Sequence, residues 1–487
     1  MLFQKNRNEL MVLLILVIIS LGLRIILRNA SLSVWDDVEY AFRVQHGSLY
    51  AHSPGYPGYM IIGRAFYLLT FFLARASSEQ SLILLSAIIG GLLVIPTYLL
   101  VRTLFGKKAA IFGSIFMILN PNIADMSAQA MSDVASVFFV TLAAGLLYFG
   151  LKKSNNKILL IAAAVCGFSI AVRLTNLLLL PFFVVATFSK IKQYANRKVI
   201  GMSFMAVLII SGLIAYLPLL FERGLNGFMD FMTVYHPVNA VAYNLQIMSE
   251  RTIYFMGNLI NYITPTAIAV SLIGLYWLFF KHKNLFLELI IWISSYLLFF
   301  LLYGPTFSMQ RFSLPVYPAI AALFSFGLTE LNTRLRKILT EKKIKHIITI
   351  SATICLLGLV FGSIIIWSVP TYKNLEYWSK NPFPTKTFAL WVNETVPENA
   401  VIVSGEYSWV LQYYMNLPED TPRLIWDSDS SWIMYSVNKI IADGERVFII
   451  NVQLEKCKFI EESYETRGYA NYSETLSIYE ILPKLSS

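Results

Sequence analysis

The chain has 487 residues, of which 56% are hydrophobic and 14% are charged, and its mean hydropathy is +0.61. Soluble globular chains are about 45–50% apolar and about 25% charged, so this composition indicates a protein whose main solvent is lipid. The aromatic content of 14% excludes a disordered chain. Three cysteines exclude a disulfide framework, and no two of them have the spacing of a metal site.

Long apolar runs predict an α-helical polytopic membrane protein. A helix needs about 20 apolar residues to cross the hydrocarbon core of a bilayer. Runs of this kind predict about eleven spans, of which the fifth and sixth are separated only by the four residues Arg173 to Asn176. The predicted spans are 9–28, 80–103, 109–122, 133–151, 158–174, 175–189, 199–220, 256–280, 285–303, 312–331 and 346–369.

The lysines predict how these spans are oriented. All fifteen lysines before residue 370 fall in alternate gaps between the spans, starting with the N-terminal segment, and none falls in the other gaps. Because positive charge is retained on the cytoplasmic side, this pattern predicts a multi-pass protein of the cell membrane with a cytoplasmic N-terminus and an extracytoplasmic C-terminus.

The composition changes at about Pro370. Residues 1–369 carry 29 basic and 13 acidic side chains, a net charge of +16, whereas residues 370–487 carry 10 and 16, a net charge of −6. The overall charge of +10 therefore reflects membrane sidedness, and we expect no nucleic-acid partner. Alternating patterns predict a small soluble α/β domain over 370–487. Its expected helices lie near 385–395, 407–416 and 432–443, and its expected strands at 400–404, 423–426, 446–452 and 475–482.

Two outer segments of the transmembrane domain 1–369 exceed ordinary loop length, at 29–79 and 221–255. Within the first, residues 58–74 are apolar but contain Arg64. Counting this stretch as a span would reverse the lysine pattern that follows it. We therefore expect a helix that lies on or dips into the outer interface.

Acidic residues gather just after the first span. If the stretch around them is helical, Asp36, Glu39, Tyr40 and Arg43 share one face. A carboxylate beside a dry cleft could act as a general base, whereas a solvated loop that tolerates acids is the alternative. The next motif, His52 to Gly58, contains two prolines and two glycines and predicts a fixed turn. A purely structural role for this turn is the alternative.

The predicted outer gaps contain arginines and no lysines. Guanidinium groups bind phosphate through two parallel hydrogen bonds, which an ammonium group cannot do. The arginines therefore indicate phosphate binding, and snorkelling at the interface is the alternative. The candidates for phosphate binding are Arg64, Arg173, Arg251 and Arg311.

The order of these motifs resembles the GT-C superfamily of polytopic glycosyltransferases, and most of all the protein O-mannosyltransferases and the lipid A aminoarabinose transferases. The resemblance covers 1–330 in topology, but its specific motifs occupy only some thirty residues. Asp36-Asp37 stands where the family typically has Asp-Glu, and one proline of the family's turn is replaced in His52-Ser53-Pro54-Gly55. The oligosaccharyltransferase signature W-W-D-Y-G is absent. The motifs that carry the resemblance are W-D-D-V-E-Y-A-F at 35–42, H-S-P-G-Y-P at 52–57, S-D-V at 132–134, R-L-T-N at 173–176 and R-F-S-L-P-V-Y-P at 311–318.

The resemblance implies transfer of a sugar from a polyprenyl-phosphate donor to a protein, lipid or glycan acceptor hydroxyl on the outer face, with inversion. It places Asp36 as the catalytic carboxylate and Asp37 as the second acid. Arg311 is the first candidate for the donor phosphate, followed by Arg64, Arg173 and Arg251. Some superfamily members use a divalent cation, and Asp36 and Asp37 are the residues that would hold one here. The implied substrate-binding residues are Glu39, Tyr40, His52 and Tyr56.

Three other classes of function stay open at this point. A glycan polymerase or ligase of another fold would place its key residues in one large late outer loop. A polytopic transporter would show half-repeats and charges near the middle of its spans, and a structural scaffold would carry no site. The early acidic strip favours the glycosyltransferase, and product analysis would separate a transferase from a transporter.

Overall fold

The computed structural model divides the chain into two compact units. Unit 1 comprises Met1–Arg28 and Gly47–Ser379, and unit 2 comprises Asn29–His46 and Lys380–Ser487. Unit 2 therefore takes up an early segment that the sequence assigned to an outer loop of the transmembrane domain, and the division lies ten residues after the expected boundary. The structure describes residues 7–33, 35–52, 54–190, 197–234, 253, 257, 259–303, 311, 313–341, 346–418, 421–425, 430–450, 459–473 and 476–483.

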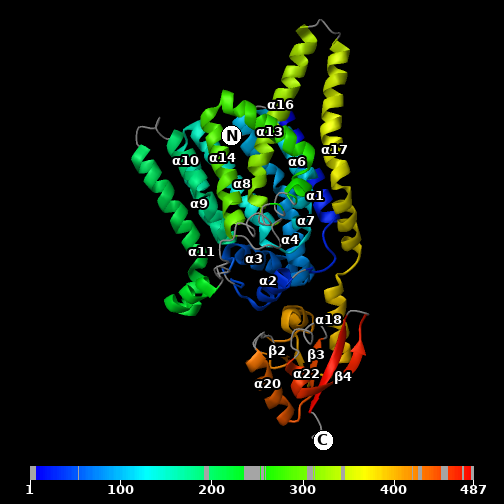
Figure 1. Ribbon diagram of the computed structural model, residues 1–487. Helices are drawn as coiled ribbons and strands as arrows, with labels where there is room; N and C mark the ends of the chain where they lie inside the picture. The colour runs from blue at the N-terminus through cyan, green and yellow to red at the C-terminus, as the bar shows by residue number, and fades with distance from the viewer. Residues whose placement is uncertain are drawn as a thin grey trace. The chain divides into compact units, whose positions relative to one another are not determined.

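Unit 1 is a bundle of helices (Figure 1). Two 3₁₀ turns interrupt it, at η1 (Leu174–Leu179) and η3 (Leu314–Val316). The α-helices are α1 (Arg7–Ile26), α3 (Pro57–Ala74), α4 (Ser78–Leu92), α5 (Val94–Phe105), α6 (Lys107–Leu119), α7 (Pro121–Ala128), α8 (Ser132–Lys153), α9 (Asn156–Val172), α10 (Leu180–Lys190), α11 (Arg197–Val234), α13 (Pro265–Lys281), α14 (Lys283–Tyr303), α16 (Tyr317–Glu341) and α17 (His346–Lys380).

Seven helical segments of the described residues are long and apolar enough to cross a membrane. They contain α1, α3, α4 with α5, α8, α11, α16 and α17, and the bent pair of α6 and α7 would make an eighth. The apolar helices α9 and α13 have only 17 residues each. The protein is therefore a multi-pass membrane protein, as predicted. Whether α3 crosses the membrane or lies at its interface stays a prediction.

The expected helix break near Arg173 is confirmed, and a second break lies at Pro121. The apolar run over 158–189 is interrupted at Arg173, where α9 ends and η1 begins. At Pro121 the chain bends by 55° between α6 and α7, because proline cannot continue the hydrogen bonding of the preceding helix.

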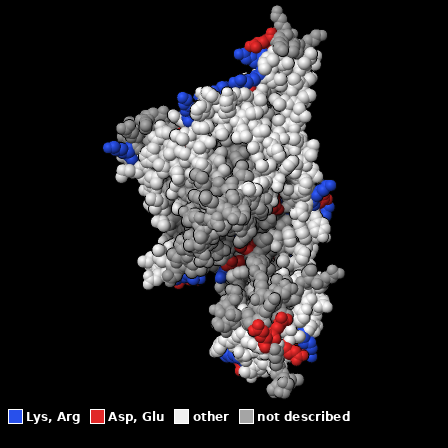
Figure 2. Space-filling view, viewed as in Figure 1, with Lys and Arg blue, Asp and Glu red and all other residues white. Residues whose placement is uncertain are grey.

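The side chains of the lysine-bearing gaps meet at one end of unit 1, which we call the lysine end. Arg102 pairs there with Glu9, and Lys152 Nζ donates to the carbonyl of Thr103 at 3.0 Å. On the face that Figure 2 shows, basic side chains of unit 1 gather at this end, and a broad uncharged band lies beside them. Residues of the lysine-free gaps meet at the opposite end, which we call the arginine end.

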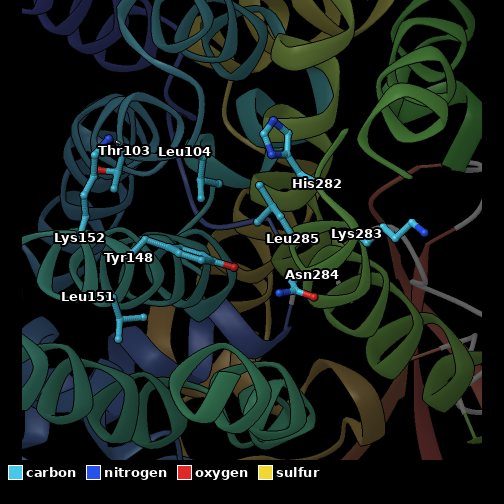
Figure 3. Close-up of a pocket in the computed structure, with 9 residues that line it drawn as sticks. All are labelled: Thr103, Leu104, Tyr148, Leu151, Lys152, His282, Lys283, Asn284 and Leu285. Carbon is cyan, nitrogen blue, oxygen red and sulfur yellow. Dashed lines mark hydrogen bonds between the residues drawn. The ribbon is translucent and has the colours of Figure 1, made fainter. Parts of the chain in front are cut away.

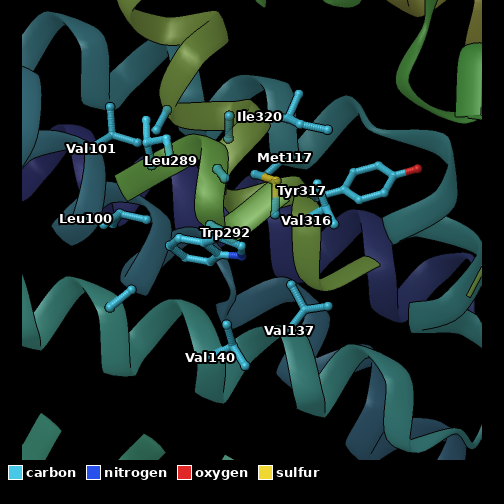
Figure 4. Packing of buried hydrophobic residues seen from close by; sticks show 14 of the residues in the cluster. Leu100, Val101, Met117, Val137, Val140, Leu289, Trp292, Val316, Tyr317 and Ile320 are labelled. Atoms are coloured by element: carbon cyan, nitrogen blue, oxygen red, sulfur yellow. The ribbon is translucent and has the colours of Figure 1, made fainter. Parts of the chain in front are cut away.

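Tight packing holds the centre of unit 1. The indole nitrogen of the buried Trp292 donates to the carbonyl of Pro315 at 2.8 Å, which ties α14 to η3 (Figure 4). Helices α13 and α16 touch backbone to backbone, because a Cβ atom added to Gly274 would lie 2.1 Å from the Leu323 carbonyl oxygen. Small residues at such crossings are typical of membrane helices.

Unit 2 is built on a five-stranded sheet with the order β2-β1-β3-β5-β4. The first three strands in that order are parallel, and β5 runs antiparallel to both β3 and β4. Its strands are β1 (Val401–Val403), β2 (Leu424–Ile425), β3 (Val447–Ile450), β4 (Tyr464–Asn471) and β5 (Ser477–Pro483), and its helices are α2 (Trp35–His46), α18 (Pro384–Thr395), α19 (Ser408–Tyr414), α20 (Ser430–Ala442) and α22 (Phe459–Ser463), with a 3₁₀ turn η4 (Gly405–Tyr407).

The predicted α/β character of this region is confirmed, and every expected helix and strand in it is present within a few residues. The sequence missed α22 and β4. Strand β4 lies at the edge of the sheet, and Tyr464 is its only buried residue, so it lacks the apolar run that marks β3.

Helix α2 packs within unit 2 rather than standing as a loop of unit 1. The Phe42 ring lies 5.8 Å from the Trp409 ring, and the Arg43 guanidinium lies over the same indole at 5.3 Å. The hydroxyl of Ser31 accepts a hydrogen bond from the Phe383 amide at 2.8 Å. These contacts bind residues 29–46 to the C-terminal part of the chain.

Candidate functional site

A buried ion pair joins two of the sequence motifs at the arginine end. Arg173, which directly follows α9, lies 2.8 Å from a carboxylate oxygen of Asp133 in the first turn of α8. The exposed fractions of the two side chains are 4% and 0%. Arg173 also donates to the Ser132 hydroxyl at 3.2 Å, so the S-D-V and R-L-T-N motifs form one site.

The backbone explains why Arg173 reaches this position. Its extended conformation ends α9, and the amide still donates to the Ser169 carbonyl at 3.0 Å. Three residues later, the Asn176 side chain accepts a hydrogen bond from the Ser136 hydroxyl at 2.9 Å and donates one to the Ser169 carbonyl at 2.8 Å. The Tyr296 hydroxyl donates to Thr175 at 2.8 Å. The R-L-T-N segment is thereby fixed against α8, α9 and α14.

The predicted turn before α3 lies against the same arginine. Its backbone closes on itself, because Ala51 donates to Gly55 at 2.8 Å and Gly55 donates to His52 at 2.7 Å. Tyr56 adopts a left-handed conformation with φ 48°, and its ring lies 5.9 Å from the Arg173 guanidinium. The His52 ring meets the Tyr56 ring edge-on at 5.2 Å.

A glycine permits this approach. A Cβ atom added to Gly58 would lie 2.6 Å from the Val172 amide nitrogen, so only a glycine lets α3 begin against the last residues of α9. The turn is also tied to α11, because the Tyr50 hydroxyl donates to Glu222. Burial and this carboxylate together raise the pKa of the Tyr50 phenol.

Arg311 adds a second positive charge at this site. It lies close enough to Arg173 for their like charges to repel, and it is half-buried. The motif that it opens continues through η3 to Tyr317, the first residue of α16, which is fully buried and whose hydroxyl accepts a hydrogen bond from Asn122 at 3.0 Å. Two guanidinium groups thus lie close together, one of them paired with Asp133, and such an arrangement is suited to an anion.

The other predicted arginines are distributed differently. Arg64 lies on α3, half-buried, with its guanidinium 5.5 Å from the centre of the Tyr67 ring. Arg251 lies outside the described residues. Arg24 is almost fully buried and donates to the carbonyls of Met117 and Ile118 at the end of α6, which is a structural role in closing that helix.

The acidic residues predicted as part of the site lie on α2, which belongs to unit 2. Asp37 is fully buried, and its carboxylate accepts hydrogen bonds from the Ser33 amide at 2.7 Å and the Ser33 hydroxyl at 2.9 Å. Glu39 lies 3.5 Å from Arg43, and Tyr40 is buried. Asp36 is half-buried, so it is the more accessible of the two adjacent carboxylates.

These observations divide the acidic residues by environment. Asp37 holds the chain segment that leads into α2, as a carboxylate at a helix start commonly does. The sequence analysis named the S-D-V motif but gave Asp133 no role in the site, although an acid at the end of an apolar span was a visible signal. Among the described residues, no three histidine, cysteine, aspartate or glutamate side chains gather so that they could hold a metal ion, and we derive no metal-dependent step.

Comparison with known proteins agrees with this architecture. Residues 63–219 match the family model of dolichyl-phosphate-mannose-protein mannosyltransferases. No curated protein matches the chain significantly in sequence. The structure of ArnT from Cupriavidus metallidurans in the apo state is similar over 96% of this chain and 97% of that one, with a TM-score of 0.68 and 13% identity.

Two further structures share the fold. ArnT from the same organism bound to undecaprenyl phosphate matches with a TM-score of 0.66 and 13% identity, over 96% of this chain and 97% of that one. The oligosaccharyltransferase of Archaeoglobus fulgidus matches with a TM-score of 0.61 and 14% identity, over 98% of this chain and 74% of that one. The chain therefore has a GT-C-like fold, and the predicted resemblance to GT-C membrane glycosyltransferases is confirmed.

Proposed function

We propose that the protein is a membrane glycosyltransferase that moves a sugar from a polyprenyl-phosphate donor to an acceptor hydroxyl. The observation that carries the proposal is the proximity of Arg173, which is buried and paired with Asp133, to Arg311. Two neighbouring guanidinium groups favour an anion such as phosphate. The family-model match and the fold of the ArnT that binds undecaprenyl phosphate support the same class of donor.

In the proposed reaction, the acceptor oxygen attacks the anomeric carbon as the bond from that carbon to the phosphate oxygen breaks. The departing phosphate gains negative charge and needs stabilisation rather than a proton. Arg173 and Arg311 supply fixed positive charge for it, and they act best in a site from which water is excluded. Asp133 and Ser132 hold Arg173 in place for this role.

Asp36 is the proposed general base that accepts the proton of the acceptor hydroxyl. It is more accessible than Asp37, whose carboxylate already accepts two hydrogen bonds from Ser33. A single displacement with one base predicts inversion at the anomeric carbon, in contrast to the paired carboxylates of a retaining hydrolase. Glu39, Tyr40, His52 and Tyr56 are the proposed substrate-binding side chains.

The proposed orientation places the lysine end in the cytoplasm and the arginine end outside, with unit 2 extracytoplasmic. This assignment rests on the retention of positive charge on the cytoplasmic side. The donor would then be approached from the outer leaflet of the cell membrane. The acceptor hydroxyl belongs to a protein, a lipid or a glycan.

The test measures sugar transfer by the full-length protein in proteoliposomes, with a panel of radiolabelled polyprenyl-phosphate sugars and a membrane extract as acceptor. We expect Asp36→Asn to lower the rate by about 100-fold or more, the usual contribution of a general base. Arg173→Lys should also lower it, because an ammonium group cannot replace the two parallel hydrogen bonds of a guanidinium.

Asp443→Asn is the matched control, since Asp443 is an exposed carboxylate of unit 2 at the end of α20. It should transfer sugar at the wild-type rate. Normal transfer by a well-folded Asp36→Asn protein would remove the proposed base. Movement of labelled donor without a new glycosidic bond would instead indicate a transporter.

A further inference from the structure

A hollow of about 550 Å³ lies at the lysine end of unit 1, away from the proposed active site. It is formed by the C-terminal turns of α5 and α8 and by the start of α14 (Figure 3). Its floor is largely apolar and its rim is polar. The lining residues are Thr103, Leu104, Tyr148, Leu151, Lys152, His282, Lys283, Asn284 and Leu285.

The hollow has a lysine on each side. Lys152 stands on the α8 side, and Lys283 stands on the opposite side next to His282, with its side chain extending away from the centre of the hollow (Figure 3). All three side chains are exposed, so the hollow is open at the surface of unit 1.

Lys152 and Lys283 differ in their ion pairs from other lysines at the lysine end. Lys281 lies 2.6 Å from Glu330, and Lys337 lies 3.7 Å from Glu341. In the part of the chain that the structure describes, neither Lys152 nor Lys283 forms an ion pair with a carboxylate, and the one hydrogen bond of Lys152 goes to a backbone carbonyl. The rim of the hollow therefore keeps its positive charge for a ligand.

The carboxylate nearest to the floor does not cancel this charge at the rim. Glu288 is 1% exposed and is absent from the lining of the hollow. It accepts hydrogen bonds from the Tyr148 hydroxyl at 2.7 Å and from the Ser189 hydroxyl at 2.9 Å. Tyr148 thus separates Glu288 from the open space and presents its ring to it.

We propose that this hollow binds the phosphate headgroup of an anionic phospholipid. A cationic rim above an apolar floor fits an amphiphile whose phosphate meets the lysines and whose glycerol and upper acyl carbons contact Leu104, Leu151 and Leu285. Basic pockets between membrane helices are typical sites for such headgroups. This inference is independent of sugar transfer, because the hollow lies at the end opposite to the proposed donor site.

The experiment uses the full-length protein in nanodiscs of phosphatidylcholine alone or with added phosphatidylglycerol. Native mass spectrometry counts the phosphatidylglycerol that stays bound, and the thermal unfolding midpoint is measured in parallel. We expect phosphatidylglycerol to be retained by the wild type and to raise its midpoint. Lys152→Gln with Lys283→Gln should weaken retention by about 30-fold, since each lysine near a membrane surface contributes about 5-fold.

The matched control is Lys153→Gln with Lys157→Gln, which removes the same charge from two exposed lysines outside the lining of the hollow. It should retain the lipid as the wild type does. Equal retention by both double variants, or equal loss from both, would overturn the proposal. Unchanged midpoints in phosphatidylcholine show that the variants fold. An equal rise on adding inorganic phosphate in uncharged detergent would assign the site to a free anion and overturn the lipid assignment.

Discussion

At the scale of single residues, the cost of a buried charge explains the arrangement around Arg173. A guanidinium group that is 4% exposed in a membrane unit is expensive unless a carboxylate and further acceptors surround it. Asp133 and Ser132 meet this need. Arg311 places a second guanidinium group close to Arg173, and two neighbouring guanidinium groups favour a bound anion.

The ion pair of Arg173 and Asp133 predicts how substitutions change stability and sugar transfer. Asp133→Asn keeps the shape of the side chain but leaves Arg173 without its counter-charge, so we expect a loss of about 3 kcal/mol in the free energy of unfolding. Sugar transfer should fall as well, because Arg173 loses its fixed position. Denaturant unfolding and the transfer assay measure the two effects separately.

The double variant Asp133→Asn with Arg173→Met provides the control. It removes both charges, so most of the lost stability should return, while transfer should stay absent because the phosphate contact is gone. A double variant no more stable than Asp133→Asn alone would show that the pair does not act as proposed.

At the scale of elements, close backbone contacts decide where the site residues lie. Gly58 lets the start of α3 rest against the end of α9, and this contact places the turn with Tyr56 beside Arg173. We expect Gly58→Ala to lower sugar transfer by about 10-fold to 100-fold, because displacements of about 1 Å at a reacting centre have effects of this size.

Gly358→Ala on α17 is the control for this substitution, since a Cβ atom there would meet no atom within 4 Å. It should leave transfer unchanged and keep or raise the thermal midpoint, because alanine favours a helix more than glycine does. Full activity of Gly58→Ala would mean that the approach of α3 to α9 does not position the site.

The sheet of unit 2 carries a prediction about pH. Glu480 on β5 accepts hydrogen bonds from Arg446 at 2.6 Å and Arg467 at 2.7 Å, and the bond from Arg446 is the main cause that lowers its pKa below the ordinary 4.5. A lowered pKa in the folded state stabilises the fold above the unfolded-state pKa. That contribution is lost as the pH falls through the folded-state pKa.

We therefore expect the wild type to lose stability between about pH 5 and pH 3, and Glu480→Gln to lose about 1 kcal/mol less over this range. The arginine partners are exposed, so the effect is modest. Calorimetric unfolding of the full-length protein at a series of pH values measures it. Glu465→Gln removes another carboxyl group, on the exposed side of β4, and is the control, and an identical slope for Glu480→Gln and the wild type would contradict the prediction.

The elements also show what the sequence could reveal about the site. Apolar runs and breaks predicted the helices, since length and composition decide whether a segment prefers lipid. The motifs around Arg173 and Tyr56 were recognised, but the partner of Arg173 was not, because the contact between α8 and α9 depends on packing that periodicity does not encode. For the same reason the sequence assigned α2 to a loop of the transmembrane domain, whereas its buried Phe42 and Tyr40 pack within unit 2.

At the scale of the whole molecule, the distribution of charge links topology to orientation. The lysine-bearing gaps, although far apart in the sequence, meet at one end of unit 1, as the contacts of Lys152 with Thr103 and of Lys281 with Glu330 illustrate. The arginine-bearing motifs meet at the other end. The lysine-bearing gaps alternate along the sequence and also meet at one end of the bundle. This agreement supports an even number of membrane crossings between one lysine-bearing gap and the next.

The proposed orientation can be tested with single cysteines in a variant whose three native cysteines are replaced by serine. Lys153→Cys places a thiol at the lysine end, and Glu461→Cys places one on α22 of unit 2, and both positions are exposed. Because lysine-rich gaps are retained in the cytoplasm, a membrane-impermeant maleimide should label Glu461→Cys in intact cells and Lys153→Cys only after permeabilisation. The unsubstituted cysteine-free protein should stay unlabelled in both conditions. The reverse pattern would contradict the proposed orientation and would place the arginine end, with its proposed phosphate site, on the cytoplasmic face.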